Sequence, residues 1–237
     1  MALLKFGGGV VDARGSMAGN TYSKNRFGNY MRSRTKPINP RSPRQMGART
    51  TMMYLAEQWR ESPMTPTIRA AWETYAASCA WVNKLGEAVL LTGYNMFIRA
   101  NAALLRAGGA IVTAGPTALG LPGADPLAVC SAFSAASQDF TLTFDDALPW
   151  CDEDNSFLMI EVGQPQSPSR NYFNSPWRFC AAIEGDSITP PTSPTAAIAC
   201  PAWTLIEGQR IFTRLSIVRA DGRSTTKFGN AHILAVA

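Results

Sequence analysis

Apolar residues recur every three or four positions between residues 43 and 108, which is the spacing of one face of an α-helix. Three such stripes follow one another: Ala48, Met52, Leu55 and Trp59; then Ile68, Ala71, Trp72, Tyr75 and Cys79; then Phe97, Ile98, Asn101, Leu104 and Leu105. Ser42, Pro43 and Gln45 are the residues of a capping box, and Gly108 is a typical helix terminator. The pattern predicts three helices that bury their stripes against one another or against a neighbouring subunit.

The pattern changes after residue 126, where short apolar runs alternate with turn-rich segments. The runs cover residues 127–133, 139–145, 155–163, 177–185, 196–206, 209–220 and 224–237. Two of them alternate strictly between apolar and polar residues, as strands with one buried face do, and Asp221-Gly222 is a strong hairpin turn. These seven runs predict an antiparallel β-sandwich of the immunoglobulin-like or fibronectin-type-III-like kind.

Residues 1–42 have no apolar pattern that could form a core of their own. Residues 20–35 alternate like a β-hairpin, with Tyr22, Lys24 and Arg26 on one side, a tight turn at Gly28-Asn29, and Tyr30, Arg32 and Arg34 on the return. Prolines at 37, 40 and 43 then favour an extended path. A two-stranded hairpin is marginal alone in water, so we expect this one to lean on another surface.

The predicted fold class is therefore α+β. We expect an extended basic arm with a β-hairpin at residues 1–42, a small helical region at 43–108, a glycine- and proline-rich linker at 109–126, and an antiparallel β-sandwich at 127–237.

Charge is distributed unevenly along the chain. The net charge is +5, but residues 1–60 hold 11 of the 22 basic side chains and 2 of the 17 acidic ones, a balance of +9. The other residues hold 11 basic and 15 acidic side chains, a balance of −4. The chain is thus a basic arm on a mildly acidic body, which indicates an acidic partner for the arm.

The candidate partner-binding residues lie in this arm and at the start of the first predicted helix. They are Tyr22, Lys24, Arg26, Phe27, Tyr30, Arg32, Arg34, Lys36, Arg41 and Arg44. An acidic protein surface ranks first as the partner, because the hairpin, the spaced prolines and the helix cap indicate an arm that becomes ordered on docking. Nucleic acid ranks second, since basic residues neutralise phosphates and aromatic rings stack on bases. A merely solvated tail ranks third.

Other candidate chemistry is sparse, and we expect no enzymatic activity, no cofactor and no metal. His232 is the single histidine, so a histidine-rich metal site is excluded and a Ser/His or Cys/His pair would depend on that residue. The acidic cluster Asp139, Asp145, Asp146, Asp152, Glu153 and Asp154 lacks the spacing of a calcium loop, and we interpret it as a solvated loop at the rim of the sandwich.

Compartment signals favour a protein made in a cytoplasm. The five cysteines are odd in number and contain no CxxC motif, which is typical of reduced cysteines. No run approaches 18 consecutive apolar residues, so we expect no membrane contact, and the apolar start of the chain is too short for a secretory signal.

Several segments resemble structural proteins of tailed bacteriophages and prophages. They are GSMAGNTYSKNRFGNYMRSRTKPINPRSPRQ at 15–45, AAWETYA at 70–76, LTGYNMFIRANAALLRAG at 91–108 and GQRIFTRLSIVRADGR at 208–223. The resemblance covers nearly the whole chain and is most specific at 15–45 and 92–108. The last segment also resembles the penultimate strand of a fibronectin-type-III-like domain.

The resemblance implies a non-enzymatic virion component, made in the host cytoplasm and assembled into particles. We expect a capsid decoration or cement protein whose basic arm docks on neighbouring subunits, with the major capsid protein as partner and self-association in a symmetric assembly. A neck- or tail-attached structural or adhesion protein is the alternative, with neck or tail proteins as partners. A nucleic-acid-binding protein that uses the arm is the second alternative.

Overall fold

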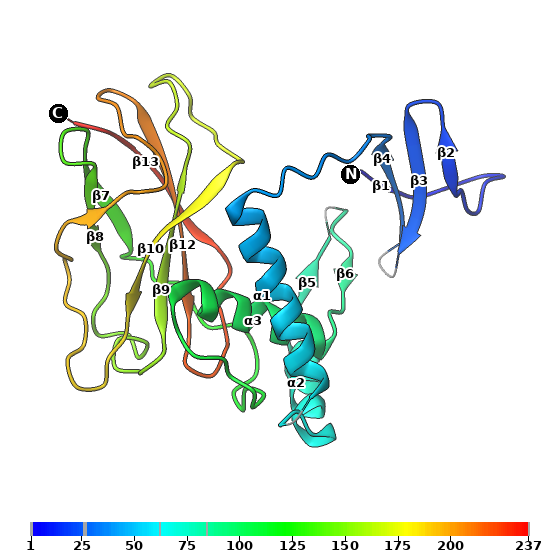
Figure 1. The fold of residues 1–237 in the computed structure, drawn as a ribbon, viewed down its shortest axis with the longest axis horizontal. Coiled ribbons are helices and arrows are strands. Elements are labelled where there is room, and N and C mark those ends of the chain that lie inside the picture. The colour runs from blue at the N-terminus through cyan, green and yellow to red at the C-terminus, as the bar shows by residue number, and fades with distance from the viewer. Residues whose placement is uncertain (1, 26–27, 62, 84, 237) are drawn as a thin grey trace.

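A sheet, a group of helices and a two-sheet sandwich follow one another along the chain (Figure 1). The computed structural model describes residues 2–25, 28–61, 63–83 and 85–236. Within these residues the chain forms three helices and four antiparallel sheets, so the predicted α+β class is confirmed. None of the helices in the described ranges is long and apolar enough to cross a bilayer.

The first sheet contains the predicted hairpin and two further strands that the sequence pattern did not indicate. Its strands are β1 (Ala2–Leu4), β2 (Gly15–Met17), β3 (Asn20–Asn25) and β4 (Gly28–Ser33), in the order β1-β4-β3-β2. Gly28 and Asn29 already belong to β4, where they pair with Asn25 and Lys24, so the turn predicted at Gly28-Asn29 was wrong. Gly28 has φ 115°, a conformation that disfavours side chains. We call this element the arm sheet. Because β3 and β4 are the two inner strands, the predicted hairpin forms the centre of a larger sheet.

The three predicted helices are present, and a small hairpin precedes the last of them. Their bounds are α1 (Pro43–Arg60), α2 (Pro66–Ser78) and α3 (Gly93–Ala107), and the hairpin is β5 (Trp81–Val82) with β6 (Ala88–Val89). Ser42, Thr65 and Thr92 each accept a hydrogen bond from the backbone three residues on, which satisfies a free amide at the helix start. At Ser42 the reciprocal half of the capping box is absent, because the Gln45 Oε1 has no hydrogen-bond partner.

The helices pack around a core of aromatic rings. Trp72 and Phe97 meet edge to face with ring centroids 5.6 Å apart, and Trp59 lies 5.2 Å from Phe97. Leu55, Trp72 and Phe97 are fully buried. The stripes of α2 and α3 are therefore covered as predicted, and so is the C-terminal half of the α1 stripe.

The N-terminal half of the α1 stripe is not buried against the other helices, and its burial against a neighbouring subunit stays a prediction. Ala48 and Met52 are exposed, with Met52 at 46% of its maximum, although they continue the line of Leu55 and Trp59. The first two turns of α1 extend past the helical core, so neither α2 nor α3 covers them there. Part of the apolar face of α1 is therefore exposed to solvent.

Two antiparallel sheets form the C-terminal part. One has the order β10 (Trp177–Glu184), β9 (Phe157–Gly163), β12 (Arg210–Val218) and β13 (Phe228–Leu234). The other has the order β11 (Ile198–Ala199), β8 (Asp139–Thr143) and β7 (Val129–Ser134). All seven apolar runs thus contain a strand. His232 belongs to β13, where its backbone pairs with that of Phe212 on β12.

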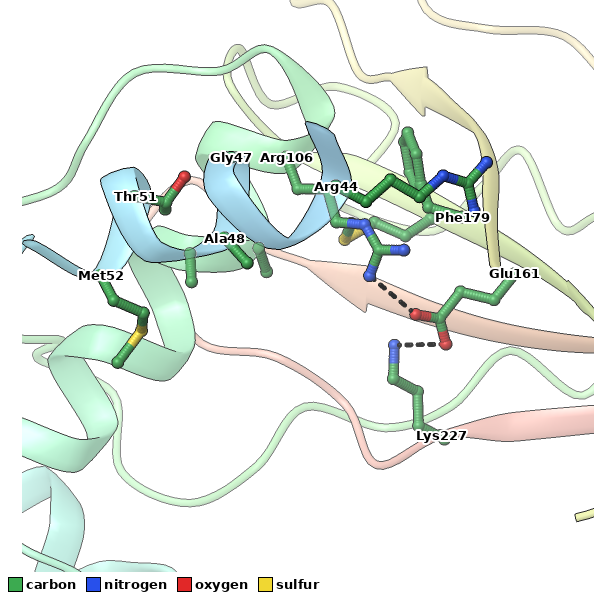
Figure 2. A pocket seen from close by; sticks show the side chains of 12 residues that line it. Arg44, Gly47, Ala48, Thr51, Met52, Arg106, Glu161, Phe179 and Lys227 are labelled. Carbon is green, nitrogen blue, oxygen red and sulfur yellow. Dashed lines mark hydrogen bonds and ion pairs between the residues drawn. The ribbon is translucent and has the colours of Figure 1, made fainter. Parts of the chain in front are cut away.

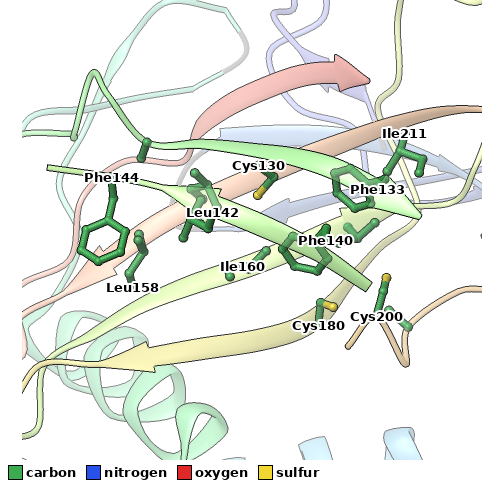
Figure 3. Close-up of a cluster of buried hydrophobic side chains, with 14 of the residues drawn as sticks. Cys130, Phe133, Phe140, Leu142, Phe144, Leu158, Ile160, Cys180, Cys200 and Ile211 are labelled. Carbon is green, nitrogen blue, oxygen red and sulfur yellow. The ribbon is translucent and has the colours of Figure 1, made fainter. Parts of the chain in front are cut away.

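The two sheets pack face to face around one apolar core (Figure 3). Phe133 and Phe140 stack with centroids 4.8 Å apart, and Ile160 and Ile211 of the facing sheet belong to the same buried cluster. Each such side chain contributes about 1.5–3 kcal/mol by leaving water. All five cysteines are buried and carry free thiols.

Helix α3 joins the helices to the sandwich by lying on the outer face of the four-stranded sheet. Leu104 of α3 forms a buried cluster with Phe157, Met159 and Val218 of that sheet. The Arg99 Nε donates to the Ser224 Oγ over 3.1 Å. The helical region and the sandwich therefore share an apolar interface.

The segment 109–126 has an ordered path along this body. The Val112 backbone N–H donates to the Asn101 Oδ1 over 2.6 Å, and the Asn101 Nδ2 donates to the Val112 carbonyl over 3.0 Å. The Trp72 Nε1 donates to the Thr113 carbonyl over 2.8 Å. These bonds tie the segment to α3 and α2.

Candidate functional site

The candidate residues of the hairpin are divided between the two faces of the arm sheet. Tyr22 lies opposite Met31, and Tyr30 lies opposite Ser23. Because directly opposed residues of antiparallel strands share a face and neighbours alternate, Tyr22 and Lys24 point to one face and Tyr30 and Arg32 to the other. The sheet therefore presents an aromatic ring beside a cation on each side. Arg26 and Phe27 lie outside the described residues.

No residue among 2–25 and 28–33 is buried, so the arm sheet is a single layer with both faces accessible. Met17 is 71% exposed. An ion pair between Lys5 and Glu87 links the sheet to the β5–β6 hairpin, and both side chains are largely exposed. A sheet normally buries one face against another layer, and this one has no such layer within the described residues.

The remaining candidates are spread along the connection to the body. Arg34, Lys36 and Arg41 lie in the exposed segment 34–42, where the Arg34 backbone N–H donates to the Gly19 carbonyl over 2.8 Å. Arg44 lies in the first turn of α1, where it lines a groove in the body. The structure therefore places the sheet residues together and Arg44 apart from them.

This groove, which we call the α1 groove, has a volume of about 770 Å³ (Figure 2). One wall is the exposed stripe of α1, another is the C-terminal half of α3, and the floor is the outer face of β9 and β10. Its lining residues are Arg44, Gly47, Ala48, Thr51, Met52, Ala102, Ala103, Arg106, Met159, Glu161, Phe179 and Lys227. The groove thus combines an apolar surface with charged groups at one end.

Glu161 is the centre of the charged end. Its side chain is charged and yet only 6% exposed, because it lies in the middle of a buried strand. The Arg106 Nη1 lies 3.0 Å from the Glu161 Oε1, and the Arg214 Nη2 lies 2.7 Å from the Oε2. The Lys227 Nζ lies 3.2 Å from the Oε2. Three cations from α3, β12 and the segment before β13 therefore surround one carboxylate.

The pKa shifts of Glu161 and Lys227 combine the effects of burial and of the neighbouring charges. Burial would raise the pKa of Glu161, but Lys227 and Arg214 outweigh burial and the pKa lies below its usual value. Burial lowers the pKa of Lys227, and Arg214 and Arg106 lower it further, although Glu161 acts in the opposite direction. The lowered pKa of Lys227 therefore reflects burial first, and the neighbouring cations add to it.

Sequence reasoning missed this charge cluster. Glu161 stands inside the apolar run FLMIEVG, which was a visible signal, because a charge there must find a partner. Arg214 lies directly opposite Glu161 in the sheet, and Arg106 and Lys227 come from other elements. Their convergence depends on strand register and on the position of α3, which the sequence pattern does not give.

The predicted acidic cluster is divided among separate local contacts. Glu153 forms a two-bond ion pair with Arg219, and the Asp154 Oδ1 accepts the Ser187 backbone N–H over 2.8 Å. The Asp146 Oδ2 accepts the Ser193 backbone N–H over 3.4 Å. Across the described part of the chain, no three His, Cys, Asp or Glu side chains form a group that could hold a metal ion.

Comparisons with known proteins give no family for this chain. It matches no protein-family model, no curated protein and no solved structure.

Proposed function

We propose that the chain is a structural protein of a tailed-phage virion that docks on neighbouring subunits through its basic arm. The observation that carries the proposal is the arm sheet, which has ordered strands and no buried residue among those described. Ordering a backbone costs about 1–2 kcal/mol per residue, and burial of apolar surface is the main compensation. A partner surface over one face of the sheet would supply that burial.

Charge identifies the kind of partner. Lys24 and Arg32 are exposed on opposite faces of the arm sheet, and Lys36 and Arg41 follow in the exposed connection. An acidic protein surface complements these groups and would guide the arm to its place. Such weak contacts become effective when an assembly repeats them by symmetry, as a capsid lattice does. We therefore favour a decoration or cement protein that bridges subunits of the major capsid protein.

The sandwich supports the proposed fibronectin-type-III-like or immunoglobulin-like identity. Lettering its strands A to G in chain order gives the sheets E-B-A and D-C-F-G. The first, second and fifth strands thus form one sheet and the others form the second, with the fourth strand beside the third. We take this strand order as support for a Greek-key sandwich of that kind, in which the fourth strand has moved to the second sheet relative to the immunoglobulin constant type.

Deleting residues 1–42 tests the docking proposal. We expect the shortened chain to fold and remain soluble but to be absent from purified particles, while the full chain is present. The matched control is the full chain with Arg223→Gln, which removes a body cation that pairs with Asp221 and leaves the arm intact. Normal incorporation of the shortened chain would contradict the proposal.

The neck or tail position is the second candidate for the same docking chemistry. Copy number per particle distinguishes the two, because a decorating protein follows the capsid lattice and is present in hundreds of copies, whereas a neck or tail ring holds about a dozen or fewer. Quantitative mass spectrometry of purified particles gives this number directly.

A further inference from the structure

The groove-facing side of α1 is an apolar surface that the chain itself leaves open. Leu55 and Trp59 pack in the helical core, whereas Ala48 and Met52, on the same stripe, line the α1 groove. Across the groove, Met159 and Phe179 of the sandwich line the floor. Met159 itself is almost fully buried, so the exposed Met52 and the half-buried Phe179 supply most of the accessible apolar surface. The flexible Met52 side chain can adapt to different apolar groups.

The charged end of the same groove has more cations than anions. Arg44, Arg106 and Lys227 line it, and Glu161 is the single carboxylate among the lining residues. Arg106 and Lys227 already share Glu161, and no ion pair of Arg44 is found among the described residues. An incoming carboxylate would therefore meet unsatisfied positive charge at this end.

We propose that the α1 groove is a second docking site, which binds an acidic segment of a partner protein. The carboxylate of the segment lies between Arg44, Arg106 and Lys227. An apolar side chain next to it packs against Met52 and Phe179, above the buried Met159 at the floor. The site is independent of the arm, and it can be present whether or not the arm docks on a virion.

The chemistry of the groove favours this occupant over the alternatives. A nucleic-acid backbone carries a phosphate at every residue and would bring several of them close to the Glu161 carboxylate, where they repel. The arm of a second copy is basic, so the cations of the groove would repel it. A segment that has a carboxylate beside an apolar side chain matches both ends of the groove.

The test uses the full chain and a blocked peptide in which leucine alternates with glutamate. The methionine methyl groups are built-in reporters for NMR, because Met52 and Met159 line the groove while Met17 and Met31 lie in the arm sheet. We expect the peptide to shift the signals of Met52 and Met159. A peptide with glutamine in place of glutamate should bind at least about tenfold more weakly, which is the loss of one ion pair.

Two charge reversals on α1 provide a matched pair of variants. Arg44→Glu changes the groove and should weaken peptide binding about tenfold or more. Arg49→Glu makes the same change on the same helix, at an exposed residue that does not line the groove, and should leave binding within about twofold.

Three results would overturn the proposal. The first is a shift confined to Met17 and Met31, which would place the peptide on the arm. The second is no binding of the peptide, or equal weakening by both charge reversals. The third is self-association of the free chain that Arg44→Glu abolishes, which would make a second copy the occupant.

Discussion

Arg214 and Glu161 lie directly opposite each other on β12 and β9, and the Arg214 Nε lies 2.8 Å from the Glu161 Oε2. The pair joins two neighbouring strands on the outer face of the sheet. Arg106 and Lys227 then connect the same carboxylate to α3 and to the start of β13. One side chain thus stabilises the contact between the helices and the sandwich.

Replacing Glu161 by glutamine should destabilise the protein. The change leaves three cations close together without a carboxylate, and we expect a loss of about 2 kcal/mol in the free energy of unfolding. The loss is smaller than for a fully buried pair, because Arg106 and Lys227 keep 45% and 42% of their side-chain exposure. Urea unfolding measures the difference. Glu184→Gln, at an exposed glutamate on β10, is the control and should change stability little.

The same carboxylate should make stability depend on acid pH. The pKa of Glu161 is lower in the folded chain than its ordinary value of 4.5, so the unfolded chain binds the proton more tightly. Its contribution is complete above pH 4.5 and is lost as the pH falls through the lower, folded pKa. Unfolding curves at a series of acid pH values should show a fall in stability that is smaller in Glu161→Gln. An equal fall in both proteins would contradict this role.

Asn101 should be necessary for holding the segment 109–126 against α3. Asn101→Ala leaves the N–H and the carbonyl of Val112 without their side-chain partners, and we expect a loss of about 2–3 kcal/mol. Thermal or urea unfolding measures this loss. Asn95→Ala, at an exposed position of the same helix, should change stability by no more than about 0.5 kcal/mol.

Removing the arm should leave the stability of the body unchanged. The ion pair between Lys5 and Glu87 is exposed, and such pairs add little to stability. We expect the chain without residues 1–41, which keeps Ser42 as the N-cap of α1, to unfold within about 0.5 kcal/mol of the full chain. A loss of several kcal/mol would show that the arm belongs to the folded body.

Local signals explain how much of the fold was predictable. The helices were predicted because apolar spacing coincides with caps at Ser42 and Gly108, and the sandwich strands because each apolar run ends in turn residues. The strands β1 and β2 were missed because each has three residues, too few for alternation to be visible. They form by pairing with the hairpin, which is a tertiary event.

The candidate site was predictable only in part for the same reason. A count of charges identifies a basic arm, but strand register decides that Tyr22 and Tyr30 point to opposite faces. The α1 groove depends on how far α1 extends beyond the helical core and on where α3 crosses the sheet. The spacing of Ala48 and Met52 predicts neither the extension of α1 nor the position of α3, because the same spacing occurs in a fully buried stripe.

Amide hydrogen exchange of the arm sheet, in the free chain and in assembled particles, tests the docking of the arm most directly. A single-layer sheet opens at little cost, so amides of residues 20–25 and 28–33 should exchange rapidly in the free chain, unlike those of β9 and β12. In particles the same amides should exchange slowly, because a partner covers the sheet. Equal and rapid exchange of these amides in both states would contradict the account.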